Sequence, residues 1–241
     1  MKNITAFHSV LICFLLLNIL PETGSSAKIP SSKRSKDVIA RQTPILLKET
    51  NAKGLNLGQA VCIRIFKEEK ELELWIKKGS KFSMFKSYPI CTFSGELGSK
   101  KKVGDGQAPE GFYTVYPEQL NPSSDFHLAF NIGYPNVYDR AHHYTGSAIM
   151  VHGNCVSIGC YAMTDPRIEE IFTVITKAFE GGQSSFQVQI YPFRMTTEKM
   201  EAHTGSEWTS FWQNIKTGYD YFETHQLPPA VTVSKAKYVF K

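Results

Sequence analysis

The chain has 241 residues, a formal net charge of +5 and five cysteines. This length provides one sizeable hydrophobic core, and so mild a positive charge does not single out a nucleic-acid partner. The sequence contains no internal repeat, no phosphate-binding glycine loop and no interleaving of basic with aromatic residues, which argues against repeat proteins, nucleotide-binding proteins and nucleic-acid-binding proteins.

Residues 1–27 have the layout of a cleavable secretory signal. Lys2 is followed by the apolar run 10–20 and then by a small-residue triplet that ends at Ala27. The run is too short to span a bilayer comfortably, and a proline and a glycine interrupt the residues after it, which disfavours a retained membrane anchor. We expect export across the inner membrane, cleavage near Ala27 and a periplasmic location.

Three segments are expected after this signal. Residues 28–54 are polar and contain the basic stretch SSKRSK, so they are expected to form a solvated linker. A single folded domain is expected over residues 55–225. Residues 226–241 contain a leucine and two prolines at 227–229 and are expected to be a C-terminal extension with an edge strand at 231–233.

From residue 61 onward, apolar and polar residues alternate with the period of half-buried β-strands. The first two such stretches flank the sequence KEEK and predict a hairpin. A glycine-rich stretch with the triplet Lys100 to Lys102 predicts a flexible connection after the third. Strands are expected at 61–65, 72–76, 82–90, 112–116, 127–132, 147–151 and 186–190.

Two helices are expected in the second half of the domain. Asp165-Pro166 is typical of a helix start, and apolar residues then recur at steps of three and four up to Phe179. Residues 204–207 have the spacing of a capping box, and the aromatic stripe from Trp208 to Phe222 is expected to pack in the core rather than to bind glycans. These elements predict a β-rich α+β fold, a mixed sheet or sandwich of six to nine strands with two or three peripheral helices.

The candidate chemistry lies in residues 148–165. An apolar run brings His152 to its end, and Cys160 follows a glycine eight residues later. A thiol attacks as its thiolate, and histidine is the usual base because it exchanges protons near neutral pH. The amides of Gly159 and Cys160 are placed to face a developing oxyanion. This pattern predicts a nucleophile, a base and an anion site.

Other roles for these cysteines remain open at this point. Cys160 could be a buried hydrophobic residue or half of a disulfide, for example with Cys155. His152 could bind zinc together with both cysteines, although the CxxC pairs of structural zinc sites are missing. In an oxidising compartment, Cys62, Cys91, Cys155 and Cys160 permit three full pairings.

The long connection YPNVYDRAHHYTG before the catalytic stretch is aromatic and charged, as substrate-binding loops often are. Arg140 is either a clamp for a substrate carboxylate or the partner of the neighbouring Asp139. Tyr144 is a second candidate for substrate binding. His142 and His143 are expected to be solvated loop residues.

The motif HGNCVSIGCYAMTD (152–165) resembles the active-site signature of the YkuD-type L,D-transpeptidases, and it is most similar to the YafK-like branch of that family. The segments PEGFYTVYPEQLNP (109–122), FHLAFNIGYPNVYD (126–139) and IYPFRMT (190–196) extend the resemblance from about residue 61 to about residue 222. The interval between base and nucleophile is shorter than the family's, and Ile158 stands where the family has a second histidine.

This resemblance implies a YkuD-type catalytic domain that forms an acyl-enzyme at Cys160 with a diaminopimelate-containing stem peptide of peptidoglycan. His152 would be the base, the Gly153 carbonyl would orient its ring, and Ser157 would position the loop and bind substrate. Neither a cofactor nor a metal is implied. The alternatives are a hydrolase that detaches a lipoprotein from peptidoglycan diaminopimelate, and a non-catalytic cell-wall-binding module.

Overall fold

The computed structural model describes residues 28–241, so the predicted secretory signal and its cleavage site lie outside the described residues. Within that range the chain forms two five-stranded sheets, one two-stranded sheet and five α-helices, which confirms the mixed α+β class. The twelve strands of residues 28–241 exceed the expected six to nine. The strands that were not predicted are mostly two residues long, which is too short to show an alternation of apolar and polar residues.

The first sheet has the strand order β3-β2-β1-β10-β5. Its strands are β1 (Val61–Phe66), β2 (Glu71–Lys78), β3 (Lys81–Pro89), β5 (Gly111–Val115) and β10 (Phe186–Tyr191). β1 and β2 form the predicted hairpin, and β1 runs parallel to β10. All of β1 is buried because Ile63 and Ile65 face the main core, whereas Phe66 packs beneath the C-terminal helix.

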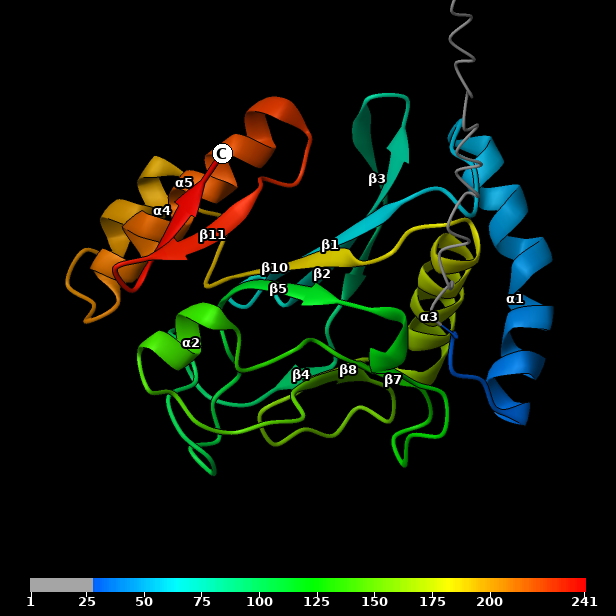
Figure 1. Cartoon of the computed structure of the whole chain (residues 1–241), viewed down its shortest axis with the longest axis horizontal. Helices are drawn as coiled ribbons and strands as arrows, with labels where there is room; N and C mark the ends of the chain where they lie inside the picture. The colour runs from blue at the N-terminus through cyan, green and yellow to red at the C-terminus, as the bar shows by residue number, and fades with distance from the viewer. Residues whose placement is uncertain (1–27) are drawn as a thin grey trace, which may run out of the picture.

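The second sheet has the order β4-β9-β8-β7-β6 and carries the candidate chemistry. Its strands are β4 (Thr92–Phe93), β6 (Leu120–Asn121), β7 (Ala129–Asn131), β8 (Met150–His152) and β9 (Tyr161–Ala162); the turn η1 (Pro117–Gln119) precedes β6. Both sheets contribute to one core, in which Ile63 and Phe130 are fully buried. Figure 1 shows the two sheets as layers, with α3 (Asp165–Glu180) beside them.

The two predicted helices are present with different starts. α3 spans the predicted residues, but Thr164 is its N-cap and Asp165 is its first residue. α5 (Thr209–His225) follows the short helix α4 (Thr197–Ala202), and its N-cap is Trp208. The predicted capping box at residues 204–207 is therefore wrong. The aromatic stripe is buried against the first sheet, which confirms core packing.

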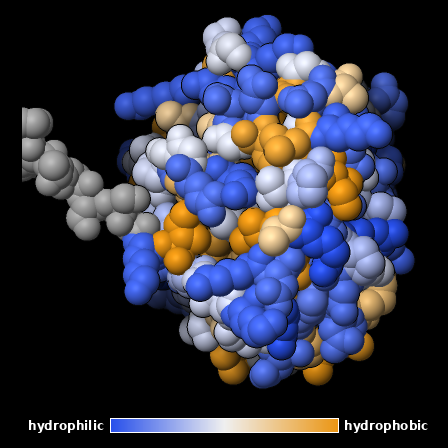
Figure 2. All heavy atoms as spheres, turned by 90° about the vertical axis from the view of Figure 1, so that its right-hand side faces the viewer, coloured by the Kyte–Doolittle hydropathy of each residue, from blue (hydrophilic) through white to orange (hydrophobic). Residues whose placement is uncertain are grey.

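The expectation of a solvated linker at residues 28–54 is wrong, because most of that segment forms the helix α1 (Lys33–Ala52). Val38 and Leu46 are buried beside α3. Arg41 forms a salt bridge with Glu169 of α3 at 2.6 Å. Figure 2 views this side of the molecule, where small apolar patches are separated by hydrophilic residues. Across residues 28–241, no helix combines the length and the apolar character that crossing a membrane requires.

The C-terminal extension forms a hairpin of β11 (Val231–Ser234) and β12 (Lys237–Phe240), and β11 includes the predicted edge strand. Asn214 of α5 holds this hairpin by two hydrogen bonds to the backbone of Tyr238, each 2.9 Å long. Tyr238 also packs within the aromatic cluster of α5. The extension is therefore part of the folded unit.

The short helix α2 (Val137–Ala141) contains a buried carboxyl group. One oxygen of Asp139 accepts hydrogen bonds from the Asn136 amide (2.9 Å) and the Tyr113 hydroxyl (3.2 Å), whereas the other has no hydrogen-bond partner within residues 28–241. Burial raises the pKa of Asp139 to about 6, although those hydrogen bonds and the nearby Arg140 charge lower it in part. The ionised carboxylate is therefore destabilising in the folded state.

The Asp139→Asn variant is expected to lose a pH dependence of stability. Because the folded-state pKa of Asp139 lies above the unfolded value, the native protein binds the extra proton, and the free energy of unfolding falls as the pH rises from about 4 to about 6. That fall is on the order of 3 kcal/mol. Urea unfolding between pH 4 and pH 8 measures it, with the exposed Asp125→Asn as the charge-matched control. Equal slopes in wild type and Asp139→Asn would contradict the prediction.

Candidate active site

The strand register places His152 and Cys160 on the same face of the second sheet. β8 and β9 are parallel, and His152 is the register partner of Ala162. Cys160 lies in the bend just before β9 (Tyr161–Ala162), two residues ahead of Ala162, and extended residues two apart in a chain point to the same side. The sheet therefore brings the base and the thiol into one neighbourhood.

His152 is buried, and its ring is held from two sides. Its Nδ1 lies 2.7 Å from the carbonyl oxygen of Gly153. A carbonyl only accepts, so Nδ1 donates and Nε2 is left as the proton acceptor. The Phe126 ring packs against the imidazole at 4.7 Å between centroids. Burial lowers the pKa of His152, and the Gly153 hydrogen bond offsets part of that shift, so the ring is neutral at pH 7.

Cys160 is half-buried and carries a free thiol. Its Sγ accepts a hydrogen bond from the Met150 amide at 3.4 Å and lies 3.8 Å from the Ala148 carbonyl oxygen. Burial raises the pKa of this thiol, whereas the Met150 amide and the positive charge of Lys100 lower it. The resting site is therefore neutral, with two groups already in place that favour the thiolate.

Ser157 closes the loop onto Cys160 through two hydrogen bonds. The Ser157 hydroxyl donates to the Cys160 carbonyl at 2.7 Å and accepts from the Cys160 amide at 2.9 Å. The Cys160 amide is therefore occupied and does not offer a donor to an oxyanion, in contrast to the prediction. The Gly159 amide has no acceptor within residues 28–241, and Gly159 adopts a left-handed φ of 93°. Gly159 is the remaining donor of the predicted pair.

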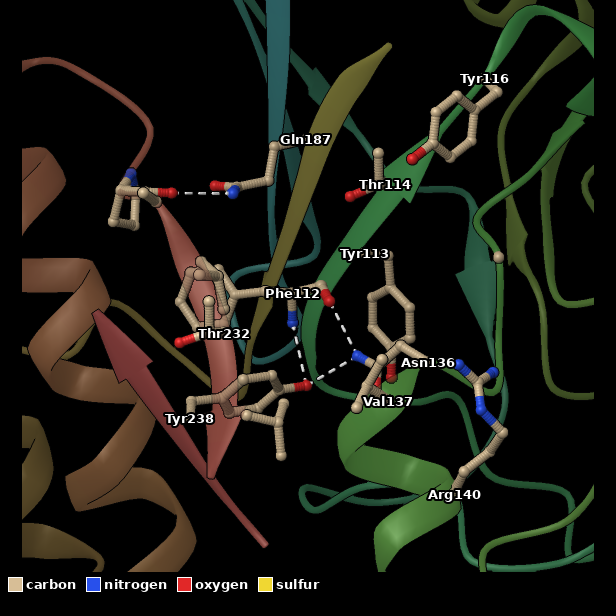
Figure 3. A pocket seen from close by; sticks show the side chains of 15 residues that line it. Phe112, Tyr113, Thr114, Tyr116, Asn136, Val137, Arg140, Gln187, Thr232 and Tyr238 are labelled. Atoms are coloured by element: carbon tan, nitrogen blue, oxygen red, sulfur yellow. Dashed lines mark hydrogen bonds between the residues drawn. The ribbon is translucent and has the colours of Figure 1, made fainter. Parts of the chain in front are cut away.

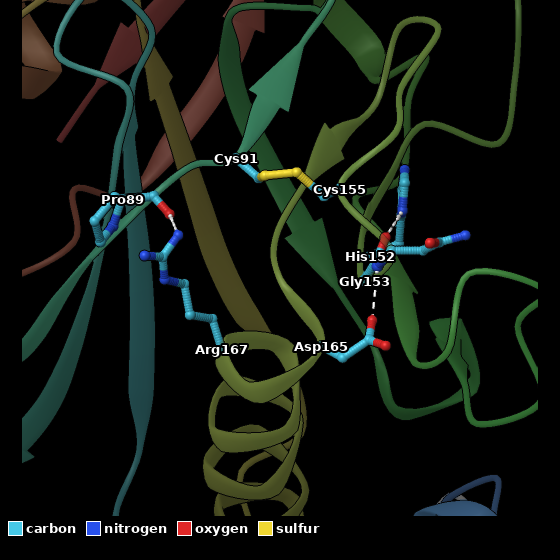
Figure 4. Close-up of a disulfide and its surroundings, with 8 residues drawn as sticks. Pro89, Cys91, His152, Gly153, Cys155, Asp165 and Arg167 are labelled. Atoms are coloured by element: carbon cyan, nitrogen blue, oxygen red, sulfur yellow. Dashed lines mark hydrogen bonds between the residues drawn. A yellow bond between two sulfur atoms is a disulfide. The ribbon is translucent and has the colours of Figure 1, made fainter.

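A disulfide joins Cys91, next to β4, to Cys155 in the loop between base and nucleophile (Figure 4). This pairing contradicts a Cys155–Cys160 disulfide and removes Cys155 as a zinc ligand. Among residues 28–241, no group of three or more histidine, cysteine and acidic side chains is arranged to hold a metal ion. Cys160 is left with a free thiol, as nucleophilic chemistry requires.

The turn after His152 is held by the start of α3. The Asp165 carboxylate accepts a hydrogen bond from the Asn154 amide at 2.7 Å (Figure 4). A Cβ on Gly153 would lie 2.5 Å from the same carboxylate oxygen, so a side chain at residue 153 would displace it. The absence of a side chain at Gly153 thus permits the close approach of Asp165 to the turn whose carbonyl accepts from Nδ1 of His152.

The two predicted substrate-binding side chains of the long connection lie elsewhere. Arg140 lines a pocket between α2 and the C-terminal hairpin, and Tyr144 lines another beside α5. Neither pocket is lined by His152 or Cys160. Arg140 forms no salt bridge with Asp139, whose carboxylate has other partners. Substrate binding by these two residues stays a prediction.

Three contributors to the site escaped sequence reasoning. Lys100 was predicted only as part of a flexible connection, yet it is buried, bonded to Asp105 at 2.6 Å and close enough to lower the pKa of Cys160. Phe126 and Asp165 act through contacts with distant residues, for which the sequence offers no signal. The run of lysines from Lys100 to Lys102 was the one sequence feature that could have indicated the role of Lys100, because a cation close to a thiol favours the thiolate.

Thiol labelling is expected to distinguish the two free cysteines of residues 28–241. Iodoacetamide should modify the half-exposed Cys160 in the native protein and leave the fully buried Cys62 intact until unfolding. Because the Cys160 pKa is raised, the labelling rate should keep increasing above pH 9. Peptide mass spectrometry reads the sites, and Cys160→Ser is the matched blank. Native labelling at Cys62, or none at Cys160 after mild reduction, would contradict this assignment.

Comparison with known proteins shows which family the chain resembles. Residues 61–190 match the model of the YkuD family, described as the L,D-transpeptidase catalytic domain. YafK of Escherichia coli strain K12, whose name assigns it to the L,D-transpeptidases, is 52% identical over 183 residues, which is 76% of this chain and 74% of that protein. YafK of Escherichia coli O157:H7 matches with the same identity and coverage.

Two solved structures are also similar. The helical cell shape determining protein Pgp2 from Campylobacter jejuni aligns with a TM-score of 0.46 and 22% identity; the match covers 68% of this chain and 59% of the length of Pgp2. Bd1075 from Bdellovibrio bacteriovorus aligns with a TM-score of 0.41 and 18% identity over 73% of this chain and 78% of its own. On the strength of the family match and the YafK identity, the chain belongs to the YkuD family of L,D-transpeptidase catalytic domains.

Proposed function

We propose that the chain is an exported peptidoglycan-modifying cysteine enzyme that forms an acyl-enzyme at Cys160 with a diaminopimelate-containing stem peptide. The observation that carries this proposal is the free Cys160 thiol on the same sheet face as His152, whose ring is fixed by the Gly153 carbonyl. Export rests on the sequence pattern of residues 1–27. The substrate class rests on family membership.

The reaction begins with transfer of the Cys160 proton to Nε2 of His152. The resting pair is neutral, and no hydrogen bond joins the two side chains within the described residues, so proton transfer requires them to approach when substrate is bound. The thiolate then attacks the carbonyl carbon of the stem peptide. The Met150 amide and the Lys100 charge favour the thiolate before attack, and the Gly159 amide faces the oxyanion.

Collapse of the tetrahedral intermediate expels an amine, which takes the proton from the His152 imidazolium. The carbonyl carbon is left as a thioester on Cys160. A second amine that attacks this thioester makes a new peptide bond, which is transpeptidation. Water that attacks it makes a free carboxylate, which is the hydrolysis required to detach a lipoprotein from diaminopimelate. Both fates use the same nucleophile and base.

Product analysis tests this proposal. Purified protein is incubated with diaminopimelate-containing muropeptides, with and without an attached lipoprotein peptide, and intact protein and products are read by mass spectrometry. The expected result is a thioester adduct on the Cys160 peptide together with cross-linked muropeptides. Release of the lipoprotein peptide without cross-links would assign the hydrolase instead. Unchanged substrates and no adduct on Cys160 would overturn the proposal.

A further inference from the structure

A pocket of about 460 Å³ lies between β5, α2 and the C-terminal hairpin (Figure 3). We call it the hairpin pocket; its lining includes Thr114, Arg140, Val231 and Val233. None of its lining residues lies in the 148–165 stretch that holds the base and the thiol. The proposed acyl transfer therefore leaves this pocket without a role.

One wall of the hairpin pocket is the unpaired edge of β5, the last strand of its sheet. The Phe112 amide donates to the Tyr238 hydroxyl, and the Phe112 carbonyl accepts from the Asn136 side chain (Figure 3). Both groups of Phe112 thus point away from β10. Because the direction of the backbone groups alternates along an antiparallel strand, the N–H and C=O of Thr114 point the same way, toward the pocket.

The opposite wall is the free edge of β11. Ala230 and Lys241 exchange both backbone hydrogen bonds, at 3.2 and 3.0 Å, which fixes the alternation of the hairpin. Thr232 therefore bonds to β12, and the backbone groups of Val231 and Val233 face away from it. Two strand edges with unused backbone donors and acceptors thus line one cavity, an arrangement that accepts an added strand.

Side-chain hydrogen bonds fix the two walls relative to each other, and one positive charge beside the pocket has no acidic partner among the described residues. Gln187 donates to the Pro229 carbonyl at 3.1 Å, and Asn136 donates to the Tyr238 hydroxyl at 2.8 Å, so both edges are fixed in place (Figure 3). Arg140 is exposed on the α2 side and donates only to the carbonyl of Pro135. Within residues 28–241 its guanidinium has no carboxylate partner, which favours an anionic ligand group.

We propose that the hairpin pocket binds an extended peptide that ends in a free carboxylate. The peptide lies as a strand between β5 and β11, forms main-chain hydrogen bonds with Thr114 and with Val231 and Val233, and places its carboxylate on Arg140. The pocket volume holds a few residues, so affinity comes from the backbone bonds and the charged anchor. This site is independent of Cys160.

The probe is a fluorescein-labelled five-residue peptide of alternating valine and threonine with a free C-terminal carboxylate. Fluorescence anisotropy should show saturable binding that Arg140→Gln weakens at least about tenfold, the usual effect of removing a charged hydrogen bond. Arg167→Gln is the matched control, because Arg167 also donates to a proline carbonyl. Cys160→Ala should leave the affinity unchanged.

Two further measurements separate binding from a change in folding. The C-terminal amide of the probe should bind wild type about as weakly as Arg140→Gln binds the acid, and Arg140→Gln should weaken the amide no further. Hydrogen exchange should slow at the amides of Thr114, Val231 and Val233 when the acid probe is added. No saturable binding, equal loss in both arginine variants, or protection confined to residues 148–165 would overturn the proposal.

Discussion

Replacing Cys160 with alanine is expected to abolish the thioester adduct and to lower stem-peptide turnover by about 10⁴-fold or more, the range found when an enzyme's nucleophile is removed. The fold should survive this change, because the side chain is half-buried and its sulfur accepts one hydrogen bond, from the Met150 amide. Turnover is measured on diaminopimelate-containing muropeptides. Circular dichroism melting reports the fold.

The buried Cys62 offers the matched control. Cys62→Ala removes a sulfur from a fully buried position beside Phe82 and Phe222, so it should cost stability while turnover is retained. If the wild type shows no turnover and cell-wall binding is unchanged in Cys160→Ala, the result would support a wall-binding module that has kept the fold without the chemistry. The two cysteines thus separate a catalytic thiol from a packing one.

The sequence predicts an element correctly where one of its faces is buried, because that burial appears as a regular pattern of apolar and polar residues. The alternation at Val61, Ile63 and Ile65 predicts β1 because those side chains face the core. The strands β4, β6 and β9 were missed because two residues carry no period. α1 was missed because its polar composition suggests a linker, whereas tertiary contacts such as Arg41–Glu169 hold it.

The same division applies to the candidate site. His152 and Cys160 stand in one motif, so their proximity was predictable from the resemblance, and the strand register places them on one face. The occupied Cys160 amide was not predictable, because it depends on where the Ser157 hydroxyl points. The partner of Cys155 lies 64 residues away, just before β4, and cysteine spacing alone left three pairings open.

Loss of the Cys91–Cys155 disulfide is expected to lower the free energy of unfolding by about 4 kcal/mol, because the cross-link spans 64 residues of the unfolded chain. Cys91→Ala, Cys155→Ala and the double variant should be equally unstable, since either change removes the whole cross-link. Reduced wild type should match them in urea unfolding. Reduction without effect on wild type would contradict a structural disulfide.

Turnover should fall with stability, because this disulfide constrains the segment that spaces the base from the thiol. Asn154 and Cys155 both have left-handed φ values, 65° and 50°, which a non-glycine residue adopts at a cost. Once the bond to Cys91 is lost, that turn relaxes, and the Gly153 carbonyl that is hydrogen-bonded to His152 moves with it. The double variant assayed without reductant isolates this effect, since added thiol would also change the state of Cys160. Wild-type turnover in the double variant would mean that the Asn154–Asp165 hydrogen bond alone holds the turn.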